Sequence, residues 1–137
     1  MRNINRIVLH CSATVEGKEY SVDTIRGWHK AKGWSDIGYH YVISLDGCIE
    51  IGRPIDRQGA HVRGHNKDTI GICYVGGVDA DLKPKDTMTP EQEDAFRELV
   101  SSIRTLFGED ITIHGHNEFS SKACPSFIVK DKFSDLY

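Results

Sequence analysis

The sequence of 137 residues predicts an α/β protein with a central mixed β-sheet flanked by helices. Two observations lead to this class. Apolar strand-like runs are interspersed with helical patterns, and one pair of strand-like runs flanks the turn dipeptide Asp46-Gly47. Interspersed strands and helices favour a sheet with helices packed on it, and the hairpin adds an antiparallel pair. The length is typical of one domain, so we expect a single domain over residues 1–137.

The first elements are a strand and a helix. The run RIVLH, Arg6–His10, is typical of a buried strand and ends at a histidine. Ser21 is a suitable N-cap for a helix from Val22 to about Lys32, which Gly33 would end. One face of this helix would carry Val22, Ile25, Trp28 and His29.

A hairpin is expected next. The runs Tyr39–Leu45 and Cys48–Gly52 flank Asp46-Gly47, which is a strong short-range hairpin signal. A connection rich in glycine, arginine and histidine follows without periodicity. The run TIGICYV, Thr69–Val75, then has the character of a buried strand.

The second helix has the clearest sequence pattern. Thr89, Pro90 and Gln92 combine an N-cap, a first-turn proline and the partner of a capping box. Apolar residues from Phe96 to Phe107 then recur at helical spacing before Gly108. The short run Ile111–Ile113 would close the sheet.

Composition limits the partners and the location of the chain. The net charge of −3 leaves no basic footprint, so nucleic acid is not expected as a partner. No apolar run approaches the roughly 18 residues of a membrane helix, so no membrane association is expected. The start MRNINRIVLHCSAT lacks the pattern of a secretory signal, so we expect synthesis in the cytoplasm without a signal peptide. We expect a monomer.

Four cysteines in a chain without a secretory signal argue against a disulfide framework. The sequence has no CxxC pair, which weakens a zinc-knuckle or thioredoxin-type interpretation. Cys11, Cys48 and Cys73 lie in or beside apolar runs and are expected to be buried thiols. Cys124 differs because it lies next to Pro125, outside any periodic run.

The stretch HGHNEFSSKACPSF, residues 114–127, indicates a metal site. Cys124, His10 and one of the two late histidines would form a plausible three-ligand zinc set with a fourth position open to water. Spacing alone does not choose between His114 and His116. A satisfied core histidine is the alternative for His10. Of the remaining histidines, His29 is expected to be structural and His65 to lie in an exposed loop.

Four motifs carry a resemblance that runs from Arg6 to Phe127. They are IVLHCSAT, SDIGYHYVISLDGCIEIGRP, GAHVRGHNKDTIGICYVGG and HGHNEFSSKACPSF, in this order. Together they resemble the zinc-dependent N-acetylmuramoyl-L-alanine amidases (amidase type 2) of the phage lysozyme-type and peptidoglycan recognition protein superfamily. The resemblance implies a mixed sheet flanked by helices, with one catalytic Zn²⁺ on a shallow surface groove.

The resemblance also assigns roles to individual residues. It favours His116 over His114, so that the implied metal ligands are His10, His116 and Cys124. Tyr39 and Lys122 match the catalytic positions of the family. Three further residues match positions that line the groove for the peptidoglycan stem: His40, His61 and Asn66. Because Tyr39 and His40 are adjacent, a regular strand would point them to opposite faces, so the chain there is bent or only one of them meets substrate.

The implied reaction is hydrolysis of the amide between N-acetylmuramic acid and L-alanine in peptidoglycan. Lys122 would stabilise the oxyanion, and Tyr39 would donate to the oxyanion or orient the water. The general base stays open, because Tyr39 is a poor base and Glu118 is more typical of an exposed loop residue. The family context implies a phage or prophage lysis enzyme, an endolysin, that reaches the wall after holin-type release. A cytosolic wall-recycling enzyme is the alternative role.

Two other classes of function remain open at this point. Some members of the superfamily recognise peptidoglycan without cutting it, and these typically lack a zinc ligand, often the cysteine. All three implied ligands are present here, which favours the enzyme. Some phage-type relatives also bind an RNA polymerase, so a polymerase-type protein partner is implied by family analogy alone.

Overall fold

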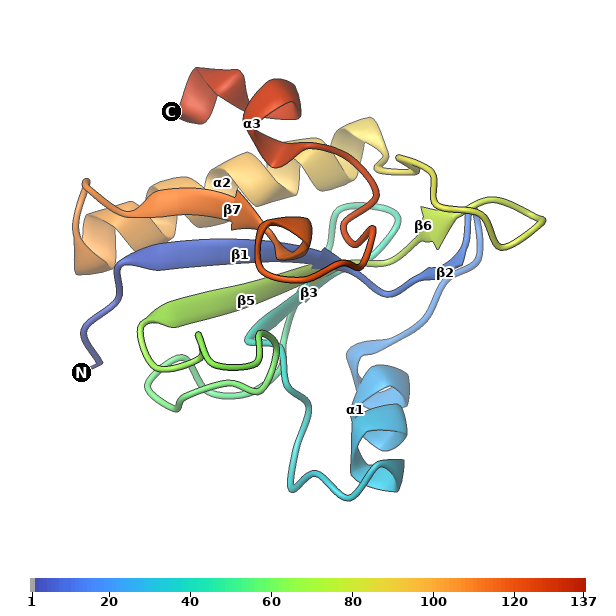
Figure 1. Cartoon of the computed structure of the whole chain (residues 1–137), viewed down its shortest axis with the longest axis horizontal. Helices are drawn as coiled ribbons and strands as arrows, with labels where there is room; N and C mark the ends of the chain where they lie inside the picture. Colours follow the sequence, from blue (N-terminus) through green and yellow to red (C-terminus); the bar gives the residue numbers. More distant parts are fainter. Residues whose placement is uncertain (1) are drawn as a thin grey trace.

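The computed structural model describes residues 2–137 and has a five-stranded sheet at its centre (Figure 1). The strand order is β4-β3-β5-β1-β7. β1 pairs in parallel with β5 and β7, β3 pairs in parallel with β5, and β4 is antiparallel to β3. The predicted α/β class with a mixed sheet is therefore confirmed. The strands are β1 Arg6–Cys11, β3 Tyr41–Ile43, β4 Ile49–Ile51, β5 Thr69–Tyr74 and β7 Thr112–Gly115.

Helices lie on both sides of this sheet. The long helix α2 and the short helix α3 cover one side, and α1 lies on the other side near one end (Figure 1). Within residues 2–137, none of the helices combines the length and apolar character needed to cross a membrane. The remaining elements are α1 Val22–Ala31, α2 Pro90–Phe107, α3 Val129–Lys132, the 3₁₀ turns η1 His116–Glu118 and η2 Ser134–Leu136, and a small parallel pair, β2 Thr14–Val15 with β6 Gly77–Val78.

Alternation along the central strands divides the sheet into two unlike faces. Successive side chains of a strand point to opposite faces. Ile7 and Leu9 of β1 therefore share one face, which forms the main core with α2. His10 lies on the other face, in register with Cys73 of β5. The strands thus bury an apolar face under α2, while the opposite face carries His10 and a second, smaller apolar cluster that includes Val42 of β3 and Ile25 of α1.

Both predicted helix starts are confirmed. The hydroxyl of Ser21 accepts the Thr24 N–H at 3.2 Å at the start of α1. At α2 the Thr89 hydroxyl accepts the Gln92 N–H at 3.1 Å, and the Gln92 side chain accepts the Thr89 N–H at 2.9 Å. Gln92 is fully buried, and its amide also donates to the carbonyls of Ile43 and Val75. The capping box therefore also ties α2 to the sheet.

Several local expectations need correction. Cys48 is exposed instead of buried, because it lies in the tight hairpin connection between β3 and β4. Of the four residues predicted on one face of the first helix, Val22, Ile25 and His29 are buried, whereas Trp28 is 39% exposed and its ring packs against Tyr20. The hairpin strands are shorter than expected, since Tyr39 precedes β3. The last strand extends through Gly115, two residues beyond the predicted end.

Candidate metal centre

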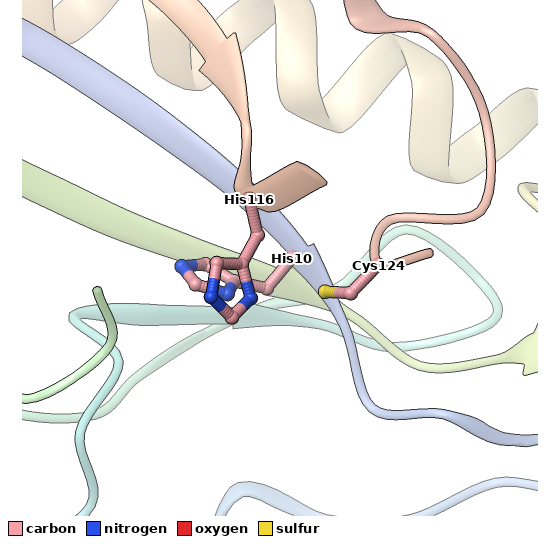
Figure 2. A group of neighbouring side chains, drawn as sticks. All are labelled: His10, His116 and Cys124. Carbon is pink, nitrogen blue, oxygen red and sulfur yellow. The ribbon is translucent and has the colours of Figure 1, made fainter. Parts of the chain in front are cut away.

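Three side chains from separate parts of the chain converge near one end of the sheet, on the side that carries His10. His10 is near the carboxyl end of β1, and His116 follows directly after β7, the parallel neighbour of β1. Cys124 lies in the loop after η1. Their candidate ligand atoms all lie within 4.8 Å of one another. Figure 2 shows the Cys124 sulfur pointing toward the two imidazoles. We call these three residues the His-His-Cys site.

The neighbouring histidine is directed elsewhere. His114 Nδ1 lies 2.8 Å from Glu118 Oε1, and its Nε2 lies 2.7 Å from the Thr112 hydroxyl. The second oxygen of Glu118 accepts the Gly115 N–H at 2.8 Å. The carboxylate of Glu118 is thus held against the start of η1. This arrangement separates His114 from the His-His-Cys site and leaves Glu118 as a turn residue instead of a candidate base.

The donor set fits a metal ion that accepts imidazole and thiolate ligands. Two imidazoles and one sulfur leave a fourth position open, which is the pattern of catalytic sites. The Cys11 N–H donates to Cys124 Sγ at 3.1 Å, a contact that stabilises a thiolate. In the metal-free chain the neighbouring Cys11 thiol and burial raise the pKa of Cys124. A bound cation would counter this increase, since cysteine binds metals as the thiolate.

Both histidines of the site offer lone pairs at neutral pH. Burial lowers the pKa of His10 far below its usual value, and the neighbouring His61 and His116 add to this effect. The pKa of His116 is lowered by burial and by the nearby Lys122 cation. A neutral imidazole is the form that binds a metal.

Tyr39 lies against the His-His-Cys site. Its ring centroid is 5.0 Å from that of His10 and 5.3 Å from that of His29. Burial raises the pKa of the Tyr39 phenol well above its usual value, and the surrounding thiols act in the same direction. The hydroxyl therefore keeps its proton at neutral pH and acts as a hydrogen-bond donor.

The three expected groove residues occupy different positions. His40 is fully buried: its Nδ1 accepts the Gly71 N–H at 3.1 Å and its Nε2 lies 2.7 Å from the Arg57 carbonyl. This placement differs from a groove-lining role, because the strand pairing draws His40 beneath the surface. His61 is 9% exposed and contacts His10. Asn66 is half-buried.

A cavity of about 380 Å³ opens beside the site. Its lining includes the candidate ligand His116, the exposed Lys122, and two of the expected groove residues, His61 and Asn66. A larger hollow of about 520 Å³ beside β7 and α3 contains no residue of the His-His-Cys site. The smaller cavity is therefore the one that adjoins the His-His-Cys site. That cavity is lined by Trp34, Ala60, His61, Val62, Arg63, Asn66, His116 and Lys122.

Sequence reasoning did not find every residue around the site. Trp34 and Arg63 line the cavity, but Trp34 lies just outside the quoted motifs, and Arg63 was given no role although it lies within the third motif. Thr69 contacts His61 from the first position of β5. In the sequence, Thr69 is only a hydroxyl residue at the start of an otherwise apolar strand, and this pattern alone is too weak to identify it as part of the site.

The fold and the site define an α/β protein with three side chains that could hold a metal ion beside an open cavity. The model of the N-acetylmuramoyl-L-alanine amidase family matches residues 1–127, and the chain belongs to this family. It is therefore a hydrolase that cleaves peptidoglycan at the amide between N-acetylmuramic acid and L-alanine.

Individual relatives agree with the family assignment. The endolysin of Klebsiella phage KP32 is 41% identical over 126 residues, which cover 92% of this chain and 83% of that protein. Peptidoglycan-recognition protein SC1a of Drosophila melanogaster is 29% identical over 118 residues, 84% of this chain and 57% of that protein. The structure of the amidase LysC from Clostridium intestinale superposes with a TM-score of 0.79 at 29% identity, covering 97% of this chain and 87% of that one.

Proposed function

We propose that residues 1–137 form one catalytic domain in which His10, His116 and Cys124 hold a single catalytic zinc ion. The observation that carries this proposal is the convergence of the three donors within 4.8 Å beside an open cavity. Imidazole and thiolate are preferred zinc ligands, and three protein donors leave room for the reacting groups. When bound, zinc would supply a water nucleophile that is ionised near neutral pH and Lewis acidity toward the amide carbonyl.

Lys122 and Tyr39 act on the charge that develops during amide hydrolysis. Lys122 lines the cavity next to His116, so its ammonium can approach the carbonyl oxygen as that oxygen becomes negative. Tyr39 retains the proton on its hydroxyl and can donate it in a hydrogen bond to the same oxygen or to the attacking water. Both groups stabilise charge that is largest in the transition state, which is the requirement for raising the rate.

The cavity beside the His-His-Cys site is the binding site for the muramyl peptide. Asn66 and Arg63 offer polar groups to this cavity, and Trp34 offers an aromatic surface. Of the expected groove residues, His61 and Asn66 border this cavity, whereas His40 is buried with its ring centroid 5.9 Å from that of His61. Peptidoglycan is the partner that this binding site fits. The net charge of −3 gives no support for nucleic acid as a partner.

The biological role that best fits is lysis at the end of a phage or prophage cycle. The relative from phage KP32 is an endolysin, and it is similar over nearly the whole chain. In this role a monomer made in the cytoplasm would act on the cell wall after release by a separate holin-type protein.

Digestion of purified cell walls tests the proposed reaction. The protein is incubated with walls in the presence and absence of a chelator, and the products are identified by mass spectrometry. Free stem peptides with an L-alanine amino terminus, lost on chelation and restored by zinc, are the expected result. Reducing sugar ends without such peptides would show glycan cleavage and would contradict the proposal.

A further inference from the structure

A buried chain of hydrogen bonds leads away from the His-His-Cys site. His10 Nε2 lies 2.9 Å from His61 Nδ1, and His61 Nε2 lies 3.1 Å from the Thr69 hydroxyl. The Thr69 hydroxyl donates to the His65 carbonyl at 2.7 Å. His10, His61 and Thr69 are 1%, 9% and 0% exposed, so bulk water does not compete for these contacts.

The His65 carbonyl, the last acceptor in this series of hydrogen bonds, fixes the direction of each of them. A carbonyl only accepts, so Thr69 uses its single hydroxyl hydrogen on His65 and must accept from His61 Nε2–H. A neutral imidazole carries one hydrogen, which leaves a lone pair on His61 Nδ1. That lone pair accepts from His10 Nε2–H. The remaining lone pair of His10 is therefore on Nδ1.

This direction requires a neutral His61, and the surroundings favour that form. The ring is buried among histidine, threonine and glycine groups, and none of its hydrogen bonds within residues 2–137 goes to a carboxylate. A buried imidazolium without a counter-ion carries a large desolvation cost. The neutral ring satisfies both of its nitrogens without that cost.

The backbone around His61 leaves its ring little freedom. A Cβ atom placed on Gly71 of β5 would lie 2.5 Å from His61 Cγ and 2.7 Å from its Nδ1. A Cβ atom on Gly59 would lie 2.9 Å from His61 Cδ2. The imidazole thus lies directly on the β5 backbone, in space that two glycines keep open. Asn66 Oδ1 accepts the N–H groups of His61 and Val62, each at 2.9 Å, and so fixes the segment that carries the ring.

We propose that His61 is a positioning residue for the metal, which holds His10 in the tautomer whose Nδ1 lone pair faces the His-His-Cys site. This inference rests on the proposed function, in which His10 is a zinc ligand. In this inference His61 supports the ligand His10 and does not contact the muramyl peptide directly. Thr69 and Asn66 in turn hold His61 in place. The far end of the His10 ring points away from Cys124, as this arrangement requires (Figure 2). Partners of this kind orient metal ligands and raise their basicity.

The proposal is tested by measuring the zinc affinity of the full chain in competition with a chelating indicator. His61→Phe keeps a planar ring but loses both nitrogens, so zinc affinity should fall about 10- to 100-fold. His61→Gln can accept with Oε1 and donate with Nε2, so it should recover part of the loss. Trp28→Phe, a change at a 39% exposed ring outside this series of hydrogen bonds, is the control and should bind zinc as the unmodified chain does.

Nitrogen NMR of the zinc-loaded chain gives a second readout that needs no variant. A protonated Nε2 and a metal-shifted Nδ1 on His10, with a protonated Nε2 on His61, are the expected result. A hydrogen on His10 Nδ1, or zinc binding by His61→Phe equal to that of the unmodified chain, overturns the role of His61 and leaves the metal site itself intact. An unmodified chain that binds no zinc would instead overturn the proposed function, and this inference with it.

Discussion

Replacement of Lys122 by methionine is the most direct test of how the groove supplies charge. The change keeps the length and most of the apolar stem of the side chain but removes the ammonium. Lys122 is exposed, and its backbone N–H is held by the Ser120 hydroxyl at 3.2 Å, so the loop should keep its shape. Zinc content should be unchanged because Lys122 is not among the three donors.

The size of the effect follows from the exposure of Lys122. Two unit charges about 4 Å apart interact by about 1 kcal/mol in water and about 4 kcal/mol at an effective dielectric constant near 20. At roughly 1.4 kcal/mol per tenfold change in rate, these limits correspond to losses of about 5-fold and about 1000-fold. Because the groove is open on one side, we expect a loss of about 10- to 100-fold in kcat.

The assay combines zinc analysis with the rate of stem-peptide release from purified walls. Lys130→Met is the matched control, because Lys130 is an exposed lysine that borders the larger hollow and not the groove. A Lys122→Met protein with normal zinc and normal turnover would refute the electrostatic role. A loss of zinc together with turnover would show that the residue acts on the metal site instead.

Three further predictions follow from the same structure. Cys124→Ala should lose stoichiometric zinc and wall hydrolysis, while Cys48→Ala, at an exposed cysteine, should retain both. Metal analysis and the release of stem peptides measure the two properties. A Cys124→Ala protein that keeps its zinc and its activity would show that the sulfur ligand is not needed. The metal-free chain should lose stability in urea as pH falls below about 6.5. Burial lowers the pKa of His40 to about 4 and of His61 to about 3, so below about pH 6.5 the unfolded state binds more protons than the folded state does. Equal unfolding free energies at about pH 7.5 and about pH 5 would contradict this prediction. Gln92→Ala should cost about 3 kcal/mol of unfolding free energy, since it removes the Gln92 donor from the buried Val75 carbonyl, one of the two donors to the Ile43 carbonyl, and a helix cap. Gln58→Ala at an exposed position should change the unfolding free energy by less than about 0.5 kcal/mol.

Elements encoded by neighbouring residues were predictable from the sequence. The capping box of Thr89 and Gln92 and the N-cap Ser21 depend on contacts within four residues, and both are present. The hairpin around Asp46-Gly47 is also present, with Gly47 at a φ of +86° that glycine adopts without strain. Residue spacing alone left two histidines as candidates for the site, and resemblance to a family favoured His116. The structure brings His116 to His10 and turns His114 toward Glu118.

What the sequence determined by itself was the local chemistry of the chain: where helices begin, where the hairpin turns, and which side chains are able to bind a metal. The tertiary structure decided which of these side chains meet. The pairing of β1 with β7 brings His10 to His116 across more than a hundred residues, and the register of β1 on β5 places Gly71, and with it the His61 ring, beside that site. Such contacts depend on strand register and burial, which are properties of the packed sheet and which no local stretch of sequence contains.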